Sequence, residues 1–237
     1  MISSRVYKRY YPDDSKNGTL FFYQWLRSYI QPDYVALNFG AGHSVDDKTR
    51  SLKGEVRKVI GVDIDREVVN NANVDETIVI KDDILPFPDN TFDLIWSDYV
   101  LEHIEKPGIF IKEIYRVLKP GASFFFRTPN KYHYVSLIAR LTPDWFHKLI
   151  ANKARGLSSE AHEPYPTFHR LNSRRDLTTY SRLTGFQKME LKFVEAEPSY
   201  LMFHPIPFLL GVFYERTVNS SDRLSGVRSN IFGRFEK

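Results

Sequence analysis

A run of small residues, Asn38-Phe39-Gly40-Ala41-Gly42-His43-Ser44, stands directly after an apolar, β-branched stretch. Small side chains let a ligand approach backbone N–H groups, so this run predicts a ligand-binding loop at the end of a strand. A dinucleotide-binding loop of the GxGxxG type needs a third glycine at position 45, where this chain has Val45. The spacing therefore argues against a loop that cradles a pyrophosphate and disfavours nicotinamide dinucleotides.

An acidic residue, Asp63, ends the next predicted strand. In this position a carboxylate accepts hydrogen bonds from both ribose hydroxyls of an adenosine cofactor. The structural alternative is an aspartate that caps the following helix. Together with the glycine loop, on a strand–loop–helix–strand frame, Asp63 favours a nucleoside-binding site.

The elements that must position these residues alternate between short β-branched or aromatic runs and longer amphipathic runs. Predicted strands cover residues 34–39, 58–63, 77–80, 92–97, 122–128, 186–196 and 230–235. Predicted helices cover residues 19–30, 46–53, 67–71, 107–118, 173–183 and 206–218, with short helical pieces at 137–141 and 145–151. Such alternation predicts an α/β fold with a largely parallel sheet and helices on both of its faces.

The stretch 129–172 breaks this alternation, because it is irregular, aromatic and rich in histidine. We interpret it as a lid inserted after the fifth strand of a single domain that covers residues 1–237. The side chains from Arg127 to His147 suit a hydroxylated ring such as a sugar or a quinol, although an ordinary aromatic cap has the same composition. His162, Glu163 and His169 lack the regular spacing of a metal site, so no metal is predicted.

Five successive segments resemble the ordered motifs of class I S-adenosylmethionine-dependent methyltransferases: residues 38–44, 61–63, 85–95, 101–103 and 113–121. Within that class they are most similar to the type 11 family, which includes ubiquinone and menaquinone biosynthesis enzymes, over residues 34–130. The resemblance implies a Rossmann-like, doubly wound sheet of seven strands with the last strand antiparallel. It also implies S-adenosylmethionine as the cofactor and S-adenosylhomocysteine as its product.

The resemblance further implies which residues hold the cofactor. In the family the glycine loop contacts the methionine end, the acid after strand two holds the ribose, and an acid after strand three meets the adenine amino group. The implied cofactor residues are Asn38, Gly40, Ala41, Gly42, Asp63, Ile64, Asp82, Asp83, Ile84 and Ser97. The choice between Asp82 and Asp83 stays open, because residues 81–85 form a shorter loop than the family usually has.

Two residues depart from the family pattern. Asn38 stands where an acid is common, and it lacks the charge that would pair with the ammonium group of the cofactor. Weaker cofactor binding is the hypothesis that follows. Ser44 replaces a third glycine, and a cap on the following helix is the structural alternative to a role in the loop.

Candidate catalytic residues stand after the predicted fourth and fifth strands, where ligands of open α/β folds collect. Methyl transfer needs an in-line approach, so the protein supplies positioning and, for a hydroxyl acceptor, a base. The candidates are Asp98, His103 and His133, with His147 as a further one. No proline stands between Ser97 and Glu105, unlike in amino-adenine and glutamine N-methyltransferases, so base N-methylation is not expected.

Composition narrows the partners and the compartment. The net charge is only +4, from 33 Lys+Arg against 29 Asp+Glu, and the basic residues are dispersed, so no nucleic-acid partner is expected. The absence of cysteine excludes disulfides, thiolate metal sites and the nucleophile of cytosine-C5 methylation. Without a signal peptide or a spanning apolar run, the expected compartment is the cytoplasm, with no stable membrane insertion.

The resemblance implies a methyltransferase that acts on a small-molecule, glycan or lipid-linked acceptor, and we expect the methylated atom to be a hydroxyl oxygen. Three alternatives stay open: C-methylation of a quinone-type precursor, a non-catalytic binding module that kept the fold, and a nucleotide-dependent oxidoreductase. The apolar stretch 198–212 is expected to pack on the sheet, with a membrane surface or a homodimer partner as the alternatives.

Overall fold

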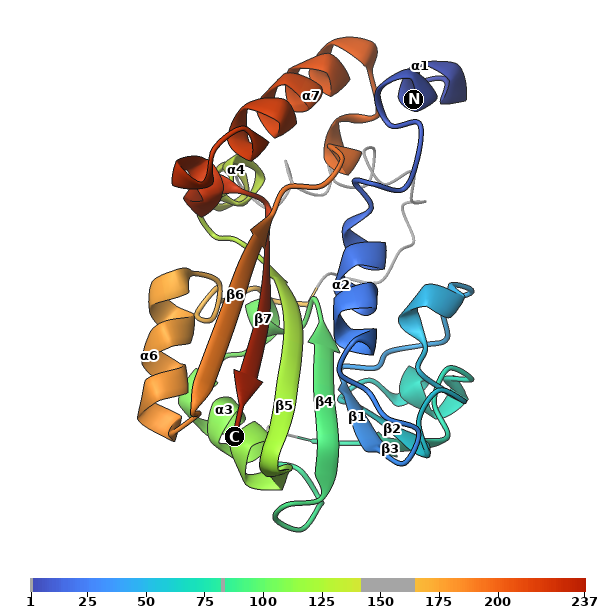
Figure 1. The fold of residues 1–237 in the computed structure, drawn as a ribbon, viewed down its shortest axis with the longest axis vertical. Coiled ribbons are helices and arrows are strands. Elements are labelled where there is room, and N and C mark those ends of the chain that lie inside the picture. Colours follow the sequence, from blue (N-terminus) through green and yellow to red (C-terminus); the bar gives the residue numbers. More distant parts are fainter. Residues whose placement is uncertain (1, 82–83, 142–164) are drawn as a thin grey trace. The chain divides into compact units, whose positions relative to one another are not determined.

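The computed structural model describes residues 2–81, 84–141 and 165–237, with only the backbone described for residues 139–141. The chain divides into two compact units (Figure 1). The sheet unit consists of Phe21–Thr128, Thr167–Lys192 and Ile231–Lys237. The second unit consists of Met1–Leu20, Pro129–Pro166 and Phe193–Asn230. The single domain and its lid at 129–172 stay predictions, because much of the lid lies outside the described residues.

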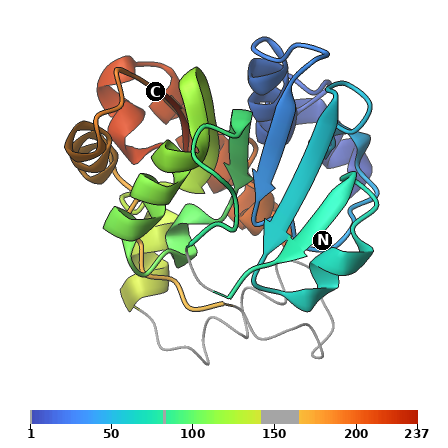
Figure 2. The ribbon, with the colours of Figure 1, turned by 90° about the horizontal axis from the view of Figure 1, so that it is seen from below.

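Seven strands form one sheet in the order β3-β2-β1-β4-β5-β7-β6. Their bounds are β1 Val35–Phe39, β2 Lys58–Asp63, β3 Glu76–Val79, β4 Phe92–Asp98, β5 Leu118–Pro129, β6 Lys188–Val194 and β7 Asn230–Glu236. The five strands from β1 to β5 are parallel to their neighbours in the sheet. Figure 2 shows β1, β2 and β3 as one twisted layer. The Gly121 amide, near the start of β5, donates to the carbonyl oxygen of Lys237, directly after the end of β7, so β7 runs antiparallel to its neighbour β5. The predicted sheet with an antiparallel last strand is confirmed.

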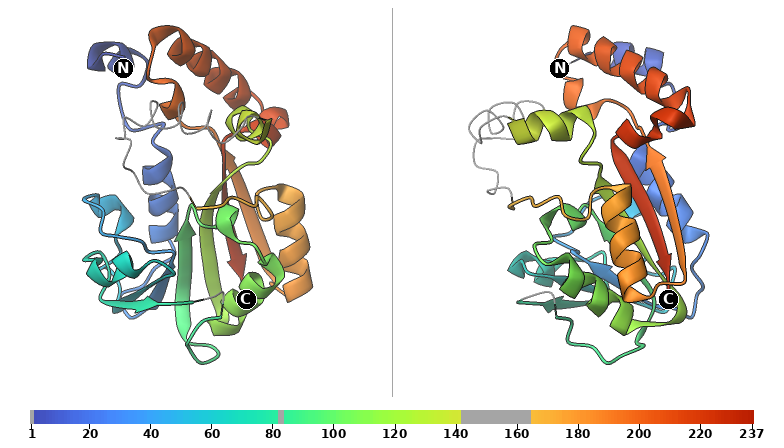
Figure 3. Two further views of the ribbon diagram at one scale, coloured as in Figure 1. Left: turned by 180° about the vertical axis from the view of Figure 1, so that it is seen from behind. Right: turned by 90° about the vertical axis from the view of Figure 1, so that its left-hand side faces the viewer.

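Helices cover the sheet on both faces, as predicted. The α-helices that the structure describes are α1 Ser4–Tyr10, α2 Gly18–Arg27, α3 Pro107–Val117, α4 Tyr134–Leu141, α6 Arg174–Thr184 and α7 Pro205–Asn219, of which α1, α4 and α7 belong to the second unit. Phe124 of β5 contacts Phe110 of α3, whereas the next residue, Phe125, contacts Trp25 of α2. Successive strand residues point to opposite faces, so α2 and α3 lie on opposite sides of the sheet, with α6 beside α3 (Figure 3).

Two predicted helices are of the 3₁₀ type, and the first of them is shorter than expected. The helix predicted at 46–53 is only the 3₁₀ turn η1, Lys48–Arg50, and the one at 67–71 is the 3₁₀ helix η2, Arg66–Asn70. Asp47 caps η1 by accepting from the Thr49 amide, and the Ser51 amide closes the turn on Lys48. Ser44 caps no helix: its hydroxyl bonds to the backbone of Asn70 and Ala72. The expectation that a helix begins at the glycine loop was therefore wrong.

Further differences concern strand β5 and short elements. The fifth strand was predicted to begin at residue 122, but β5 already begins at Leu118, which pairs with Phe92. A register shift between Phe92 and Leu94 and the positive φ of Gly121, 77°, absorb the irregularity. Helix α1 and the 3₁₀ turns η3 Leu101–His103, η4 Ser199–Leu201 and η5 Asp222–Val227 were not predicted. The helical piece at 137–141 lies within α4, and that at 145–151 lies outside the described residues.

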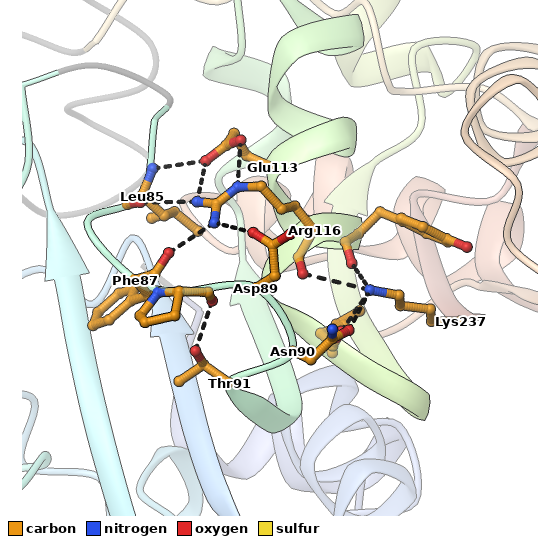
Figure 4. Close-up of polar contacts among 11 residues, drawn as sticks. Leu85, Phe87, Asp89, Asn90, Thr91, Glu113, Arg116 and Lys237 are labelled. Atoms are coloured by element: carbon orange, nitrogen blue, oxygen red, sulfur yellow. Dashed lines mark hydrogen bonds and ion pairs between the residues drawn. The ribbon is translucent and has the colours of Figure 1, made fainter.

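Arg116 of α3 holds the turn-rich loop between β3 and β4 (Figure 4). Its guanidinium donates to the carbonyl oxygens of Leu85 and Phe87, at 3.0 and 2.8 Å. The same group pairs with both carboxylate oxygens of Glu113 and with Asp89. These hydrogen bonds from Arg116 lower the pKa of Glu113 below its usual value. Two of the sequence motifs are thus one structural unit.

We expect Arg116→Gln to lower the free energy of unfolding by about 2 kcal/mol, because several charge-assisted hydrogen bonds to partly buried groups are lost. Urea unfolding followed by circular dichroism measures the change. Lys112→Gln, an exposed cation on the same helix, is the matched control and should shift the midpoint little. Equal stability of the two variants would refute the structural role assigned to Arg116.

Candidate functional site

The glycine loop after β1 is tied to the neighbouring strand through its own amides. Gly40 and Ala41 donate to the carbonyl oxygen of Val62, at 2.8 and 3.1 Å. Gly42 donates to Asp63 Oδ2 at 2.8 Å. Gly40 and Gly42 both have a positive φ, 75° and 56°, which an L side chain rarely adopts. Because the three amides bond within the protein, the loop is not a nest that cradles an anion.

Asp63 ends β2 and organises the loop from the opposite side. Besides the Gly42 amide on Oδ2, its Oδ1 accepts from the Asp65 amide at 2.9 Å. A carboxylate has about four acceptor positions, so two backbone amides leave room for two further donors. Asp63 is half-buried, and the cap on η2 is made by Asp65 instead. The helix-capping alternative for Asp63 is therefore not what the structure shows.

Asn71 stabilises the glycine loop through its side chain. Its side-chain amide donates to the carbonyl oxygens of Ala41 and Gly42, at 2.8 and 3.0 Å. The Val45 amide donates a further hydrogen bond to the side-chain oxygen of Asn73. The loop thus has fixed partners on both of its edges. Sequence reasoning missed Asn71, because its partners lie some 30 residues earlier in the chain.

The space beside this loop is open at Gly42 and closed at Gly40. A Cβ added at Gly42 would meet no described atom within 4 Å, whereas one at Gly40 would lie 2.3 Å from Val100. Ile64 and Ile84, which follow β2 and β3, are 57% and 61% exposed, as suits side chains that flank a flat ring. These features fit a nucleoside bound over the carboxyl edge of the sheet.

The other predicted cofactor residues are placed as follows. Asn38 is half-buried within β1, where it pairs with Gly61 of β2 and Trp96 of β4. Ser97 is fully buried near the end of β4. Asp82 and Asp83 lie outside the described residues, so the choice between them is untouched. The structure brings the glycine loop and Asp63 into direct contact.

A buried ion pair lies at the ends of β4 and β5. Arg127 donates to both carboxylate oxygens of Asp98, from Nε at 2.5 Å and from Nη2 at 2.6 Å. The guanidinium is also 4.5 Å from the ring centre of Tyr99, a residue held at a positive φ of 58°. Arg127 was expected in the acceptor-binding region, but its side chain is buried. With both oxygens engaged, Asp98 serves to anchor Arg127.

Glu102, in the turn η3, is a buried carboxyl group that sequence reasoning did not single out as titratable. It accepts from the Thr128 hydroxyl at 3.2 Å, and Thr128 in turn accepts from the Asn172 amide at 2.7 Å. Burial raises the pKa of Glu102 to about 7, against the hydrogen bond from Thr128. Its position within the Leu101-Glu102-His103 motif was visible in the sequence, but its burial was not.

The predicted histidines belong to different parts of the structure. His103 is half-buried in η3, in the sheet unit. His133 is buried in the second unit, where its ring contacts Tyr134 and Tyr214. Its Nε2 lies 3.4 Å from Glu195 Oε1, which is an ion-pair distance outside hydrogen-bond geometry. His147 lies outside the described residues, and among those described no metal-binding cluster is present.

Glu102 should make stability depend on pH. Because its pKa is about 7 in the folded protein and near 4.5 when unfolded, the unfolding free energy falls as the pH rises through this window. Relative to Glu102→Gln, the wild type should lose about 3 kcal/mol between pH 4.5 and 8. Urea unfolding across this range tests it, with Glu105→Gln, an exposed carboxylate, as the control. Parallel pH profiles for the wild type and Glu102→Gln would contradict the assignment.

The family model that matches this chain and two of its curated relatives are described as methyltransferases. Residues 37–126 match the family model described as a methyltransferase domain, Methyltransf_11. A probable S-adenosylmethionine-dependent methyltransferase of Mycolicibacterium smegmatis is 30% identical over 103 residues, 42% of this chain and 38% of that protein. The ubiquinone/menaquinone biosynthesis C-methyltransferase UbiE of Hydrogenovibrio crunogenus is 33% identical over 106 residues, 39% of this chain and 41% of the relative.

The chain thus spans about two fifths of the length of these curated relatives. A crystal structure of an S-adenosylmethionine-dependent methyltransferase from Archaeoglobus fulgidus shares the fold, with a TM-score of 0.58, 14% identity and full coverage of both chains. Residues 37–126 of this chain are thus similar to the methyltransferase domain of the type 11 family, and the chain shares the fold of solved methyltransferases.

Proposed function

We propose that this chain transfers the methyl group of S-adenosylmethionine to a hydroxyl group of a small-molecule, glycan or lipid-linked acceptor. The observation that carries the proposal is the hydrogen bond between Gly42 and Asp63, which aligns a carboxylate with an open glycine loop. The bound cofactor would supply an already activated, electrophilic methyl group. The chain's own residues would then bind, orient and exclude water.

In this proposal Asp63 accepts from the ribose hydroxyls through its two remaining acceptor positions. Gly42 leaves space for the methionine portion, and Asn38 faces its ammonium group without a full countercharge. Ile64 and Ile84 flank the adenine, and Asp82 or Asp83 accepts from its amino group. Ser97, near the end of β4, is the remaining residue that we propose for the cofactor site.

The loop geometry favours this cofactor over a dinucleotide. A pyrophosphate needs several free backbone amides at a helix start, whereas Gly40, Ala41 and Gly42 all donate to β2 or Asp63. No helix begins at residues 40–45, so the dipole of a helix N-terminus is also missing there. An oxidoreductase that uses a dinucleotide is therefore disfavoured.

The acceptor is proposed from sequence. The aromatic stretch 129–172 suits a hydroxylated ring, which favours O-methylation. C-methylation of a quinone-type precursor is the second candidate, because relatives matched by this chain are named C-methyltransferases. Product analysis with isotopically labelled methyl groups distinguishes a new C–O bond from a new C–C bond.

The setting of this activity is also a proposal. Among the helices that the structure describes, none is long and apolar enough to cross a membrane. We propose action in the cytoplasm, with peripheral membrane contact and a homodimer as further features. No nucleic-acid partner is part of the proposal.

Binding of the cofactor is the first test. Isothermal titration should give a micromolar Kd for S-adenosylmethionine and S-adenosylhomocysteine, and no comparable heat with NADH. Asp63→Ala should weaken both by at least about tenfold, because two charge-assisted hydrogen bonds to the ribose and the anchor of Gly42 are lost. Asp33→Ala, an exposed carboxylate before β1, is the control. Absence of binding by the wild type would leave the non-catalytic module as the better account.

The proposed general base is His103. Asp98 is engaged by Arg127, and His103 is the histidine that follows β4 in the sheet unit. His103→Gln should lower kcat by about 10²- to 10⁴-fold on a hydroxyl acceptor while the Kd for S-adenosylmethionine stays within twofold. Steady-state kinetics with His133→Gln in parallel compares the two candidates. Unchanged kcat in His103→Gln, with loss in His133→Gln, would transfer the role to His133.

A further inference from the structure

Tyr99 directly follows β4, and its backbone conformation is unusual. Its φ is 58°, in the left-handed region that a bulky side chain rarely adopts. A hydrogen bond from the Tyr99 amide to the Arg127 carbonyl oxygen, at 2.9 Å, fixes this conformation. Strained residues of this kind persist where the surrounding structure enforces them, and they concentrate at sites that bind ligands. The conformation of Tyr99 therefore indicates that the position of its side chain matters.

The Tyr99 ring packs on a fixed group and is still partly exposed. The Arg127 guanidinium lies 4.5 Å from the centre of this ring and 5.6 Å from the ring centre of Phe22. Two hydrogen bonds to Asp98 hold the guanidinium in place. Tyr99 is nevertheless 39% exposed. A supported and accessible aromatic ring is suited to contact a ligand.

Tyr99 also lies beside the glycine loop. Val100, the next residue, is so close to Gly40 that a Cβ at position 40 would lie 2.3 Å from its side chain. β1 and β4 are parallel neighbours, with Asn38 opposite Trp96, so both strands end at the same edge of the sheet. In the proposed function the glycine loop holds the methionine portion of the cofactor, which carries the reactive methyl group. A ligand in contact with Tyr99 would therefore lie next to that methyl group.

We propose that the methyl acceptor stacks on Tyr99 and is a flat aromatic ring that carries a hydroxyl group. Such a ring adds a layer to the planar guanidinium of Arg127 and the Tyr99 ring, whereas a puckered sugar ring makes contact over a smaller area. This inference rests on the proposed methyl transfer and narrows its acceptor to one chemical class.

A fixed ring also meets the geometric requirement of the reaction. The acceptor oxygen must approach the methyl carbon in line with the sulfur atom, and stacking on a rigid support restricts the directions of approach. The oxygen forms a bond to the methyl carbon as the bond from that carbon to sulfur breaks. The electron pair of the broken bond stays on sulfur, and the hydroxyl proton passes to His103, the proposed base.

Binding of catechol, a small hydroxylated aromatic ring, tests the inference. The full chain is saturated with S-adenosylhomocysteine, so that no methyl group is transferred, and saturation-transfer difference NMR gives the Kd for catechol. Tyr99→Asn should raise this Kd at least about tenfold, because Asn tolerates a positive φ but has no ring. Tyr99→Phe keeps the ring and should stay within about threefold of the wild type. A wild type that does not bind catechol, or a Tyr99→Asn variant that binds it equally well, would overturn the proposal.

Tyr29 provides a matched control. Its ring also packs on an arginine, with Arg234 at 4.3 Å from the ring centre, and it is 36% exposed. It precedes β1, however, and its φ is not positive. Tyr29→Asn should therefore bind catechol as the wild type does. An equal loss of catechol binding in Tyr29→Asn and Tyr99→Asn would count against a specific site at Tyr99.

Two further measurements separate the possible failures. Tyr99→Asn should keep the Kd for S-adenosylhomocysteine and the urea midpoint of the wild type. A lower midpoint with unchanged catechol binding would leave Tyr99 only a structural role. Binding of methyl glucoside that depends on Tyr99, without binding of catechol, would overturn the aromatic class of the acceptor. A wild type that does not bind S-adenosylhomocysteine would refute the proposed function itself, and this inference with it.

Discussion

The hydrogen bond from the Gly42 amide to the Asp63 carboxylate is the interaction on which the rest of the site depends. It joins the ends of β1 and β2 at the edge of the sheet where their carboxyl ends meet. Together with the bonds of Gly40 and Ala41 to Val62, it consumes the amides that an anion would otherwise claim. The loop therefore presents space and one oriented carboxylate, and this combination suits a ribose better than a phosphate.

Sterics set the remaining shape of this edge. Any side chain at position 40 would collide with Val100, which follows β4, so the first glycine is required by packing. Gly42 is required by its backbone conformation, since space around it is open. Both glycines hold a positive φ, and Gly40 meets the steric requirement in addition. One of them lets neighbouring strands end close together, and the other leaves room beside Asp63.

The sequence predicted the regular part of this fold well. Residues 58–63 were expected as a strand and form β2, because a buried apolar run that ends in an acid has few other solutions. Local pattern failed where distant partners decide the conformation. Ser44 bonds to residues 70 and 72 and caps no helix, and the stretch 46–53 yields only the short turn η1.

The candidate site was predicted only in part, because local sequence pattern does not show contacts between distant residues. The sequence assigned the glycine loop and Asp63 to one nucleoside site, and the structure places the two in contact. The burial of Glu102 and the pairing of Arg127 with Asp98 did not, because each depends on strands that pair far along the chain. Composition after β5 pointed to an acceptor-binding role for Arg127, whereas the fold buries this side chain.

The buried pair of Asp98 and Arg127 also restricts how such a sequence can change over generations. Loss of Asp98 takes away the carboxylate to which the buried Arg127 donates twice, and loss of Arg127 leaves Asp98 with the more distant cation of Arg50, at 3.7 Å. Breaking a buried ion pair costs about 3–5 kcal/mol, a large share of the stability of a typical domain. The two positions, 29 residues apart, therefore cannot drift one at a time. Descendants of this chain would keep both residues or replace both, so these positions are expected to be inherited as a linked pair.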